Sequence, residues 1–140
     1  MARIMAFDFG TKRLGIAVTD PLKMFATALT TIHPKDTIIF LQQYLNTEAV
    51  ETFVVGEPKQ MDGTASQSAQ DVRGFVTILK KNFPNIPVQM IDERFTSRMA
   101  SQVISQSGLK KSDRQRKDLV DTVAATIILQ SYLEKISLNF

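Results

Sequence analysis

Carboxylates stand at the ends of apolar segments, or inside them, in three separate parts of the sequence. Asp8 closes an apolar segment near the N-terminus, and Asp92 and Glu93 follow a second one. Asp121 lies inside a helical pattern that is apolar nearly all round, so that helix is expected to be largely buried. An unpaired ionised carboxylate in such a place costs several kcal/mol, which a charged partner or a metal ion would relieve.

Oxygen ligands from three elements, with no His or Cys nearby, suit a hard cation. Mg²⁺ and Mn²⁺ prefer carboxylate oxygens and octahedral geometry. Two such ions can activate water and stabilise the leaving oxygen when a phosphodiester is cleaved.

Two further acids are second-tier ligand candidates. Glu57 follows a predicted strand beside the first, and Asp118 shares a helix face with Asp121.

Each acid also has a purely structural interpretation. Asp8 can form an Asx-turn, and Glu57 with Pro58 can form an ordinary turn. Asp118 can be a solvated acid in the first turn of a helix. Ion pairs are the alternative for the others: Asp92 or Glu93 with Arg94, and Asp121 with Arg98 or Lys117. The functional interpretation rests on the acids being brought together at one sheet edge.

Basic residues precede the helix that carries Asp121. The segment 108–117 contains Lys110, Lys111, Arg114, Arg116 and Lys117 with a single acid. Such a cluster can neutralise phosphates and bind nucleic acid in a salt-dependent way, or it can be a solvated loop. The same two interpretations apply to Lys12 and Arg13 in the turn after Asp8. Arg94 and Arg98 can contact phosphate or form ion pairs with nearby acids.

The elements that would position these residues follow from hydrophobic periodicity. Strands are predicted over 4–8, 14–19, 25–30, 52–55 and 88–91. Helices are predicted after Pro34, over the apolar stripe 65–83, over a short segment starting near Thr96, and from about Gln115 to Lys135. Three early hairpin strands followed by two βα crossovers imply a mixed sheet with helices on its faces. The first, fourth and fifth strands would be parallel, with their C-terminal ends at one edge, where open α/β sheets usually bind ligands.

Composition limits the class of protein. The chain has 140 residues, a formal net charge of +3 and no Cys, so we expect one domain over 1–140 and exclude disulfides, thiolate metal sites and a Cys nucleophile. No apolar run approaches the roughly 20 residues of a membrane span. The N-terminal segment becomes acidic too early for a signal peptide. We therefore expect a cytoplasmic protein that does not bind membranes.

Four motifs in order resemble the YqgF family, also called RuvX. They are Asp8–Val18, Val54–Pro58 with Met61–Thr64, Asp92–Ser97 and Asp121–Ala125. The resemblance covers nearly the whole chain. It implies a ribonuclease H-like α/β fold similar to the RuvC resolvase, with five strands in the order 3-2-1-4-5. It also implies a bacterial cytoplasmic nuclease that matures the 5′ end of pre-16S ribosomal RNA, for which a Holliday junction resolvase role was proposed earlier.

By that resemblance, Asp8, Glu93 and Asp121 are the catalytic ligands of Mg²⁺ or Mn²⁺. The family often has an apolar residue at the position of Glu57, whereas related resolvases have an acid at the end of the fourth strand. The expected partner is nucleic acid, as pre-rRNA or branched DNA, and the ribosome is a further candidate.

Two other classes of function compete with a nuclease. The residues Asp8, Gly10 and Thr11 also resemble the first phosphate-binding turn of sugar kinases and actin-like ATPases. Those enzymes enclose ATP between two domains, which one domain of this length cannot do alone. The third hypothesis is a non-catalytic nucleic-acid-binding factor in ribosome assembly, whose binding would survive the loss of Asp8.

Overall fold

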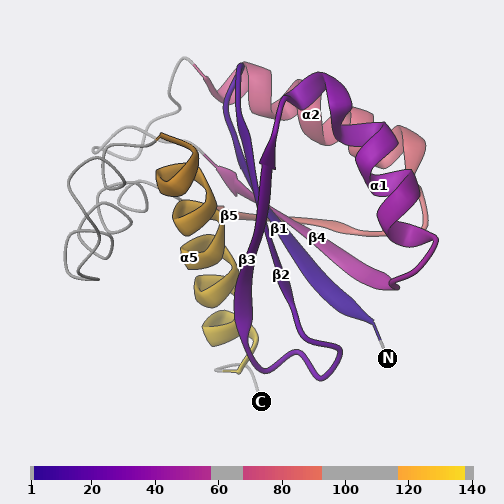
Figure 1. The fold of residues 1–140 in the computed structure, drawn as a ribbon, viewed down its shortest axis with the longest axis vertical. Helices are drawn as coiled ribbons and strands as arrows, with labels where there is room; N and C mark the ends of the chain where they lie inside the picture. The colour runs from indigo at the N-terminus through magenta and orange to yellow at the C-terminus, as the bar shows by residue number, and fades with distance from the viewer. Residues whose placement is uncertain (1, 58–67, 93–116, 138–140) are drawn as a thin grey trace.

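A computed structural model describes residues 2–57, 68–92 and 117–137, with side chains of 122–136 in the last range. The described residues form one sheet with helices on both faces (Figure 1). In chain order the elements are β1 (Arg3–Phe9), β2 (Leu14–Thr19), β3 (Ala26–Ile32), α1 (Thr37–Leu45), β4 (Val50–Glu57), α2 (Ala69–Asn82), β5 (Val88–Asp92) and α5 (Lys117–Ser137).

The strand order is β3-β2-β1-β4-β5, which confirms the order that the family resemblance implies. β2 pairs antiparallel with β1 and with β3, whereas β1 pairs parallel with β4 and β4 pairs parallel with β5. The C-terminal ends of the three parallel strands therefore lie along one edge of the sheet. We call it the C-terminal edge.

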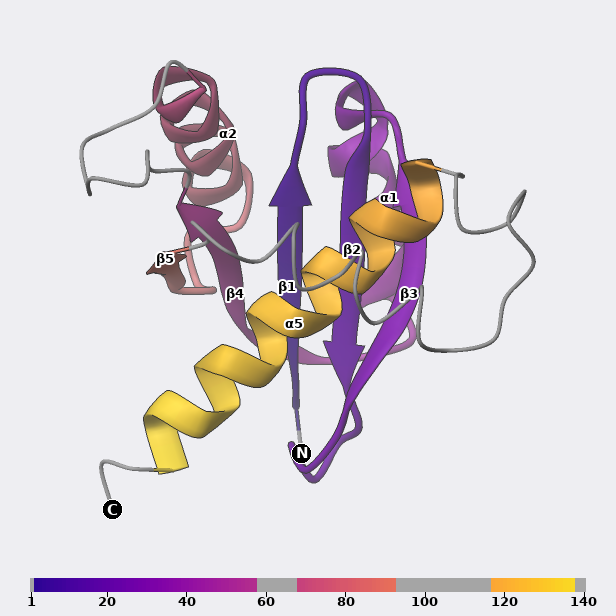
Figure 2. The same cartoon turned by 90° about the vertical axis from the view of Figure 1, so that its left-hand side faces the viewer.

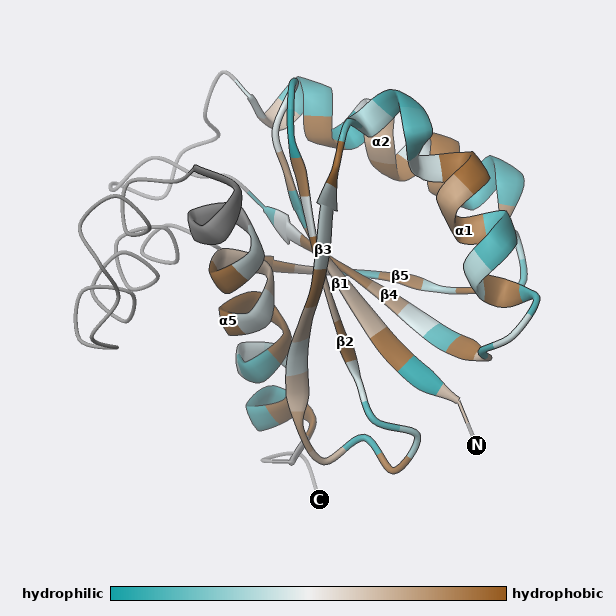
Figure 3. Cartoon of the chain, viewed as in Figure 1, coloured by the Kyte–Doolittle hydropathy of each residue, from teal (hydrophilic) through white to brown (hydrophobic). Residues whose placement is uncertain are grey.

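The central strands are apolar because helices cover both of their faces. Every residue of β2 is buried, and so are four consecutive residues in β1 and in β4. Figure 3 shows apolar residues along these strands, between the two helix layers. Side chains alternate between the faces of a strand, so neighbouring residues of β1 enter different cores.

One core lies between the sheet and the helices α1 and α2. Its centre is Phe7, whose ring makes edge-to-face contacts with Phe53 and Phe75, each with 5.5 Å between ring centroids. Leu41 of α1 and Leu79 of α2 are fully buried in the same cluster. These residues match the helical stripes predicted from the sequence, so this layer confirms the pattern-based expectation.

The other core lies between the sheet and α5, which crosses β1 and β2 diagonally (Figure 2). Ala6 and Ala17 lie opposite each other on adjacent strands, and both pack in one cluster with Ala125 of α5. Small side chains on both sides let the helix backbone approach the sheet closely. Ile128 and Leu129 complete the buried surface of the helix.

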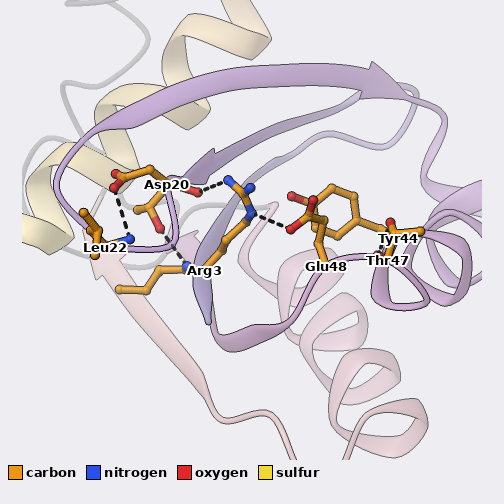
Figure 4. Close-up of polar contacts among 8 residues, drawn as sticks. Arg3, Asp20, Leu22, Tyr44, Thr47 and Glu48 are labelled. Atoms are coloured by element: carbon orange, nitrogen blue, oxygen red, sulfur yellow. Dashed lines mark hydrogen bonds and ion pairs between the residues drawn. The ribbon is translucent and has the colours of Figure 1, made fainter. Parts of the chain in front are cut away.

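Polar contacts fix the opposite edge of the sheet, where β1 begins. The Arg3 guanidinium pairs with the Glu48 carboxylate at 3.1 Å and donates to the backbone carbonyl of Thr19 at 2.9 Å (Figure 4). The Thr19 hydroxyl accepts from the N–H of Ile4 at 2.9 Å. Thr19 is fully buried, and this bond satisfies its side chain inside the core.

The turn between β2 and β3 is organised by Asp20. Its carboxylate accepts three backbone N–H groups, from Leu22 at 3.1 Å, Met24 at 2.9 Å and Phe25 at 2.8 Å. The hydrogen bond from Phe25 is the main reason that the pKa of Asp20 is lowered below its usual value of 3.8. Because Asp20 holds the N–H of Phe25, β3 starts at Ala26 and not at residue 25 as predicted.

Other element boundaries differ modestly from the predictions. β4 is longer at both ends than the predicted 52–55, so Glu57 lies within the strand. α5 spans Lys117–Ser137 within the described residues, and the predicted start near Gln115 lies outside them. The short helix predicted after Thr96 lies outside the described residues. None of the helices within the described ranges combines the length and the apolar character needed to cross a membrane.

Candidate active site

Asp8 lies one residue before the end of β1, the middle strand of the sheet, and is half-buried. Its strand neighbours Ile4 and Ala6 pack in the cluster that α5 covers, whereas Phe7 packs against α1 and α2. Alternation along the strand therefore places Asp8 on the α5 face of the sheet. A carboxylate at the C-terminal edge of a parallel strand pair is in the usual position for a ligand site.

A row of residues across three strands connects Asp8 to α5. Asp8 lies opposite Gly15 of β2, and Gly15 lies opposite Thr31 of β3. The Thr31 hydroxyl forms a 2.6 Å hydrogen bond with the hydroxyl of Thr122 in α5. The glycine in the middle of the row has no side chain, which leaves room for the helix to pass over it. The first turns of α5 therefore lie over the strand row that contains Asp8.

Asp121 is the residue before Thr122, so the backbone brings it to the same end of the sheet as Asp8. Lys117 and Asp118 belong to the first turn of the same helix. The side chains of Lys117, Asp118 and Asp121 are outside the described part of the structure. The grouping of the Asp121 and Asp8 carboxylates at one site therefore stays a prediction.

The turn after β1 is fixed by Gly10. Its N–H donates to the carbonyl of Arg13 at 2.9 Å, and a Cβ at residue 10 would lie only 2.9 Å from the same oxygen. Real Cβ atoms do not approach a backbone oxygen so closely, so the turn requires glycine here. The turn carries Lys12, which is exposed, and Arg13, which is half-buried. Both cations therefore lie within a few residues of Asp8.

Glu57 lies on the other face of the sheet. It follows Phe53 and Val55 in the alternation of β4, and both of these pack against α1 and α2. Glu57 also lines a cavity with Val72 and Arg73 of α2. It lies opposite Asp92 of β5, which is exposed. The structure therefore does not bring Glu57 together with Asp8.

Whether the site can hold a divalent metal ion depends on all of the predicted carboxylate ligands together. Among the described residues, no group of three or more His, Cys, Asp or Glu side chains is placed to hold a metal ion. Of the predicted ligands, Asp8 is the one with a described side chain on the α5 face. Glu93 and most predicted phosphate contacts lie outside the described residues: Arg94, Arg98, Lys110, Lys111, Arg114 and Arg116. The carboxylate of Asp8 itself is a ligand of the type that Mg²⁺ or Mn²⁺ prefers.

Three features of this site were not singled out from the sequence. They are Gly15, Thr31 and Thr122, which form and cover the strand row beside Asp8. One signal for them exists in the sequence. Gly15 interrupts a strand of otherwise larger residues, and an isolated glycine in a strand often marks the close approach of another backbone. The hydroxyl pair has no such signal, because its members are 91 residues apart.

A family model and two relatives each match nearly the whole of this chain. The family model of RuvX, described as a Holliday junction resolvase, matches residues 2–135. A protein of Flavobacterium psychrophilum named "Putative pre-16S rRNA nuclease" is 51% identical and covers 96% of this chain and 98% of its own length. A relative of the same name from Christiangramia forsetii is 53% identical, with coverage of 95% and 98%.

The fold also matches a solved structure. Thermus thermophilus RuvC, in a complex with a Holliday junction substrate, superposes with a TM-score of 0.52 at 16% identity and covers 97% of this chain and 96% of its own. At that identity the match supports the ribonuclease H-like fold, which confirms the fold class expected from the sequence. The family model matches nearly the whole of this chain, and relatives are about 50% identical to it. The chain therefore belongs to the RuvX family.

Proposed function

We propose that this protein is a divalent-metal-dependent nuclease that hydrolyses phosphodiester bonds, and that its substrate is the 5′ end of pre-16S rRNA. The observation that carries the proposal is the position of Asp8, at the C-terminal edge of the central strand and in the strand row that α5 covers. The names of the relatives at half identity support the choice of substrate. A protein with this substrate would act in the bacterial cytoplasm.

In this proposal Asp8, Glu93 and Asp121 are the catalytic carboxylates and hold Mg²⁺ or Mn²⁺, with Asp118 as an auxiliary acid. A bound divalent cation supplies Lewis acidity to the scissile phosphate. Asp8 provides a fixed ligand, because it lies within a paired strand, opposite Gly15 of β2, and not in a loop. Glu57 has no part in this set, because it lies on the α2 face.

Basic residues would hold the substrate backbone. Lys12 and Arg13 lie in the turn that follows Asp8, and Lys117 opens α5. The remaining predicted contacts, Arg94, Arg98, Lys110, Lys111, Arg114 and Arg116, belong to the proposal from their positions in the sequence. Each phosphate neutralised in this way releases counterions, so affinity for RNA should fall steeply as salt rises.

The description of the matching family model favours a second candidate, resolution of Holliday junctions in DNA. One experiment separates the two. The purified protein is incubated with an end-labelled pre-16S leader RNA or with a four-way DNA junction, in Mg²⁺, Mn²⁺ or EDTA. Asp8→Asn is compared with Asp36→Asn, which makes the same chemical change at an exposed acid before α1.

We expect metal-dependent cleavage of the RNA by the wild type and by Asp36→Asn, and none by Asp8→Asn. Cleavage of the junction alone would transfer the assignment to a resolvase. Full activity of Asp8→Asn would refute the proposed site. Binding of RNA without cleavage in any metal would indicate a non-catalytic assembly factor, and repeating the assay on precursor ribosomal particles would test whether the ribosome is a required partner.

A further inference from the structure

A groove opens beside the β1–β2 turn, on the face of the sheet opposite to α5. It has a volume of about 450 Å³, within the range of roughly 300–1,000 Å³ that is usual for small-ligand pockets. Its lining comes from the end of β1, the turn that follows, the segment before α1 and residues 70–78 of α2. Figure 2 shows α2 to one side of the β1–β2 turn.

One wall of the groove is aromatic and apolar. Phe9 is half-buried and lies against Phe75, with ring centroids 4.8 Å apart and an angle of 34° between the rings. Ile78, one turn further along α2, is 48% exposed and lines the same groove. Apolar side chains left this accessible beside an aromatic pair offer a surface on which a flat ring can stack.

The same wall contains an unusual glycine. Gly74 lies in the middle of α2, where glycine is about 1 kcal/mol less favourable than alanine. A Cβ added at this position would meet no atom within 4 Å. Glycine is therefore not required by packing here, and its effect is to keep the groove open.

The rim of the groove is polar and carries one charge of each sign. Lys35 provides an ammonium group, Thr11 and Gln70 provide neutral donors and acceptors, and Asp71 provides a carboxylate. Exposed Lys12 lies next to Thr11 in the turn. A flat apolar wall with hydrogen-bonding groups at its rim, and with lysines beside it, complements a nucleobase and the phosphates attached to it.

The groove shares the end of β1 and the turn that follows it with the proposed catalytic edge. Phe9, in its wall, is the residue after Asp8, and Thr11 belongs to the turn that also carries Lys12 and Arg13. Because Asp8 and Phe9 point to opposite faces of β1, a nucleic-acid strand that crosses the end of this strand can place a phosphate near one and a base near the other. A base held in the groove must be unstacked and unpaired.

We propose that this groove binds an unpaired nucleobase of the substrate, next to the phosphodiester that is cleaved. The proposal rests on the proposed nuclease function and adds that the substrate is single-stranded at the cleavage site. The groove then selects for a single strand by accepting a base that a duplex keeps stacked and paired.

The test blocks the groove without disturbing the fold. Gly74→Leu places a large side chain into open space and replaces a poor helix former with a good one, so the variant should be at least as stable as the wild type. Gln42→Leu introduces the same side chain at an exposed position of α1 and is the control. Binding is measured by fluorescence anisotropy in EDTA, with a labelled single-stranded RNA of the leader sequence and with the same RNA as a blunt duplex.

Stacking of a base on an aromatic side chain contributes about 1–3 kcal/mol to binding. Gly74→Leu prevents that stacking, so it should bind the single-stranded RNA about tenfold or more weakly than the wild type does. Binding of the duplex should change little, and Gln42→Leu should bind both RNAs as the wild type does. Equal loss of both RNAs, or no loss in Gly74→Leu, would overturn the proposal. Unchanged RNA binding with altered sedimentation would assign the groove to a second copy of the chain instead. Because the assay needs no cleavage, inactivity of the wild type would refute the nuclease and leave the groove result standing.

Discussion

Replacing Thr31 and Thr122 by valine, singly and together, should measure how much their hydrogen bond stabilises the packing of α5 on the strand row beside Asp8. Their hydroxyl oxygens are 2.6 Å apart, and both residues are half-buried. Valine keeps the shape of threonine, so the packing of α5 on β3 should be retained. A hydrogen bond of this kind contributes about 0.5–1.5 kcal/mol net to the free energy of unfolding.

We therefore expect each single variant to lower the free energy of unfolding by about 0.5–1.5 kcal/mol. The double variant should lose less than the sum of the two, with a coupling energy of about 1 kcal/mol. Urea unfolding followed by circular dichroism is sufficient to detect this, since 1 kcal/mol moves the midpoint by roughly 0.5 M. The control cycle pairs Thr122→Val with Thr27→Val, which changes an exposed threonine of β3, and it should be additive.

The same variants test whether the bond positions the site. If the start of α5 carries a catalytic carboxylate, the single variants should lower kcat several-fold while KM changes little. A coupling energy below about 0.3–0.5 kcal/mol would be indistinguishable from additivity and would refute the idea that this bond fixes α5 on the sheet. Coupling without any change in kcat would leave the bond purely structural.

Three further predictions concern other parts of the fold. Glu57→Gln should retain the metal-dependent cleavage activity of the wild type, because Glu57 lies on the α2 face; loss of activity comparable to that in Asp8→Asn would contradict this placement. Gly10→Ala should lower the free energy of unfolding by about 1–3 kcal/mol, because its Cβ would lie 2.9 Å from a backbone oxygen, whereas Gly74→Ala should not be destabilised. Calorimetry on both variants is the check. Asp20→Asn should lower the melting temperature near neutral pH, because the folded state lowers the pKa of Asp20 and so favours its charged form. That contribution is present above the unfolded pKa and disappears as pH falls through the folded value, so the two melting temperatures should converge in acid; a constant difference would contradict the assignment.

The sequence was sufficient to predict the sheet and most of its helices, because strands and helices here have distinct hydrophobic periods. The face on which a strand residue lies was harder to predict. β4 is buried on both sides, so Phe53, Val54 and Val55 are all apolar and show no alternation. Nothing in that run indicates that Glu57 belongs with α2 and not with α5. The face on which Glu57 lies follows only from the packing of Phe53 and Val55 against α1 and α2.

Long-range polar contacts could not be predicted from the sequence pattern either. The bond from Thr31 to Thr122 joins residues that no local pattern connects. The groove at Gly74 also depends on where α2 lies relative to the β1–β2 turn and the segment before α1, which periodicity does not determine. By contrast, Asp8 was predicted correctly as a residue at the C-terminal edge of the central strand, because an acid that ends an apolar strand is a local signal.

The position of α5 in the chain has a consequence for biosynthesis. The sheet surface formed by Ile4, Ala6, Ala17 and Val54 is complete in the first part of the sequence, but the helix that covers it contributes Ala125, Ile128 and Leu129. During translation this apolar surface stays open to water until α5 has left the ribosome. Between the synthesis of β5 and that of α5, the nascent chain is therefore a two-layer intermediate with an exposed apolar face, which is prone to aggregation.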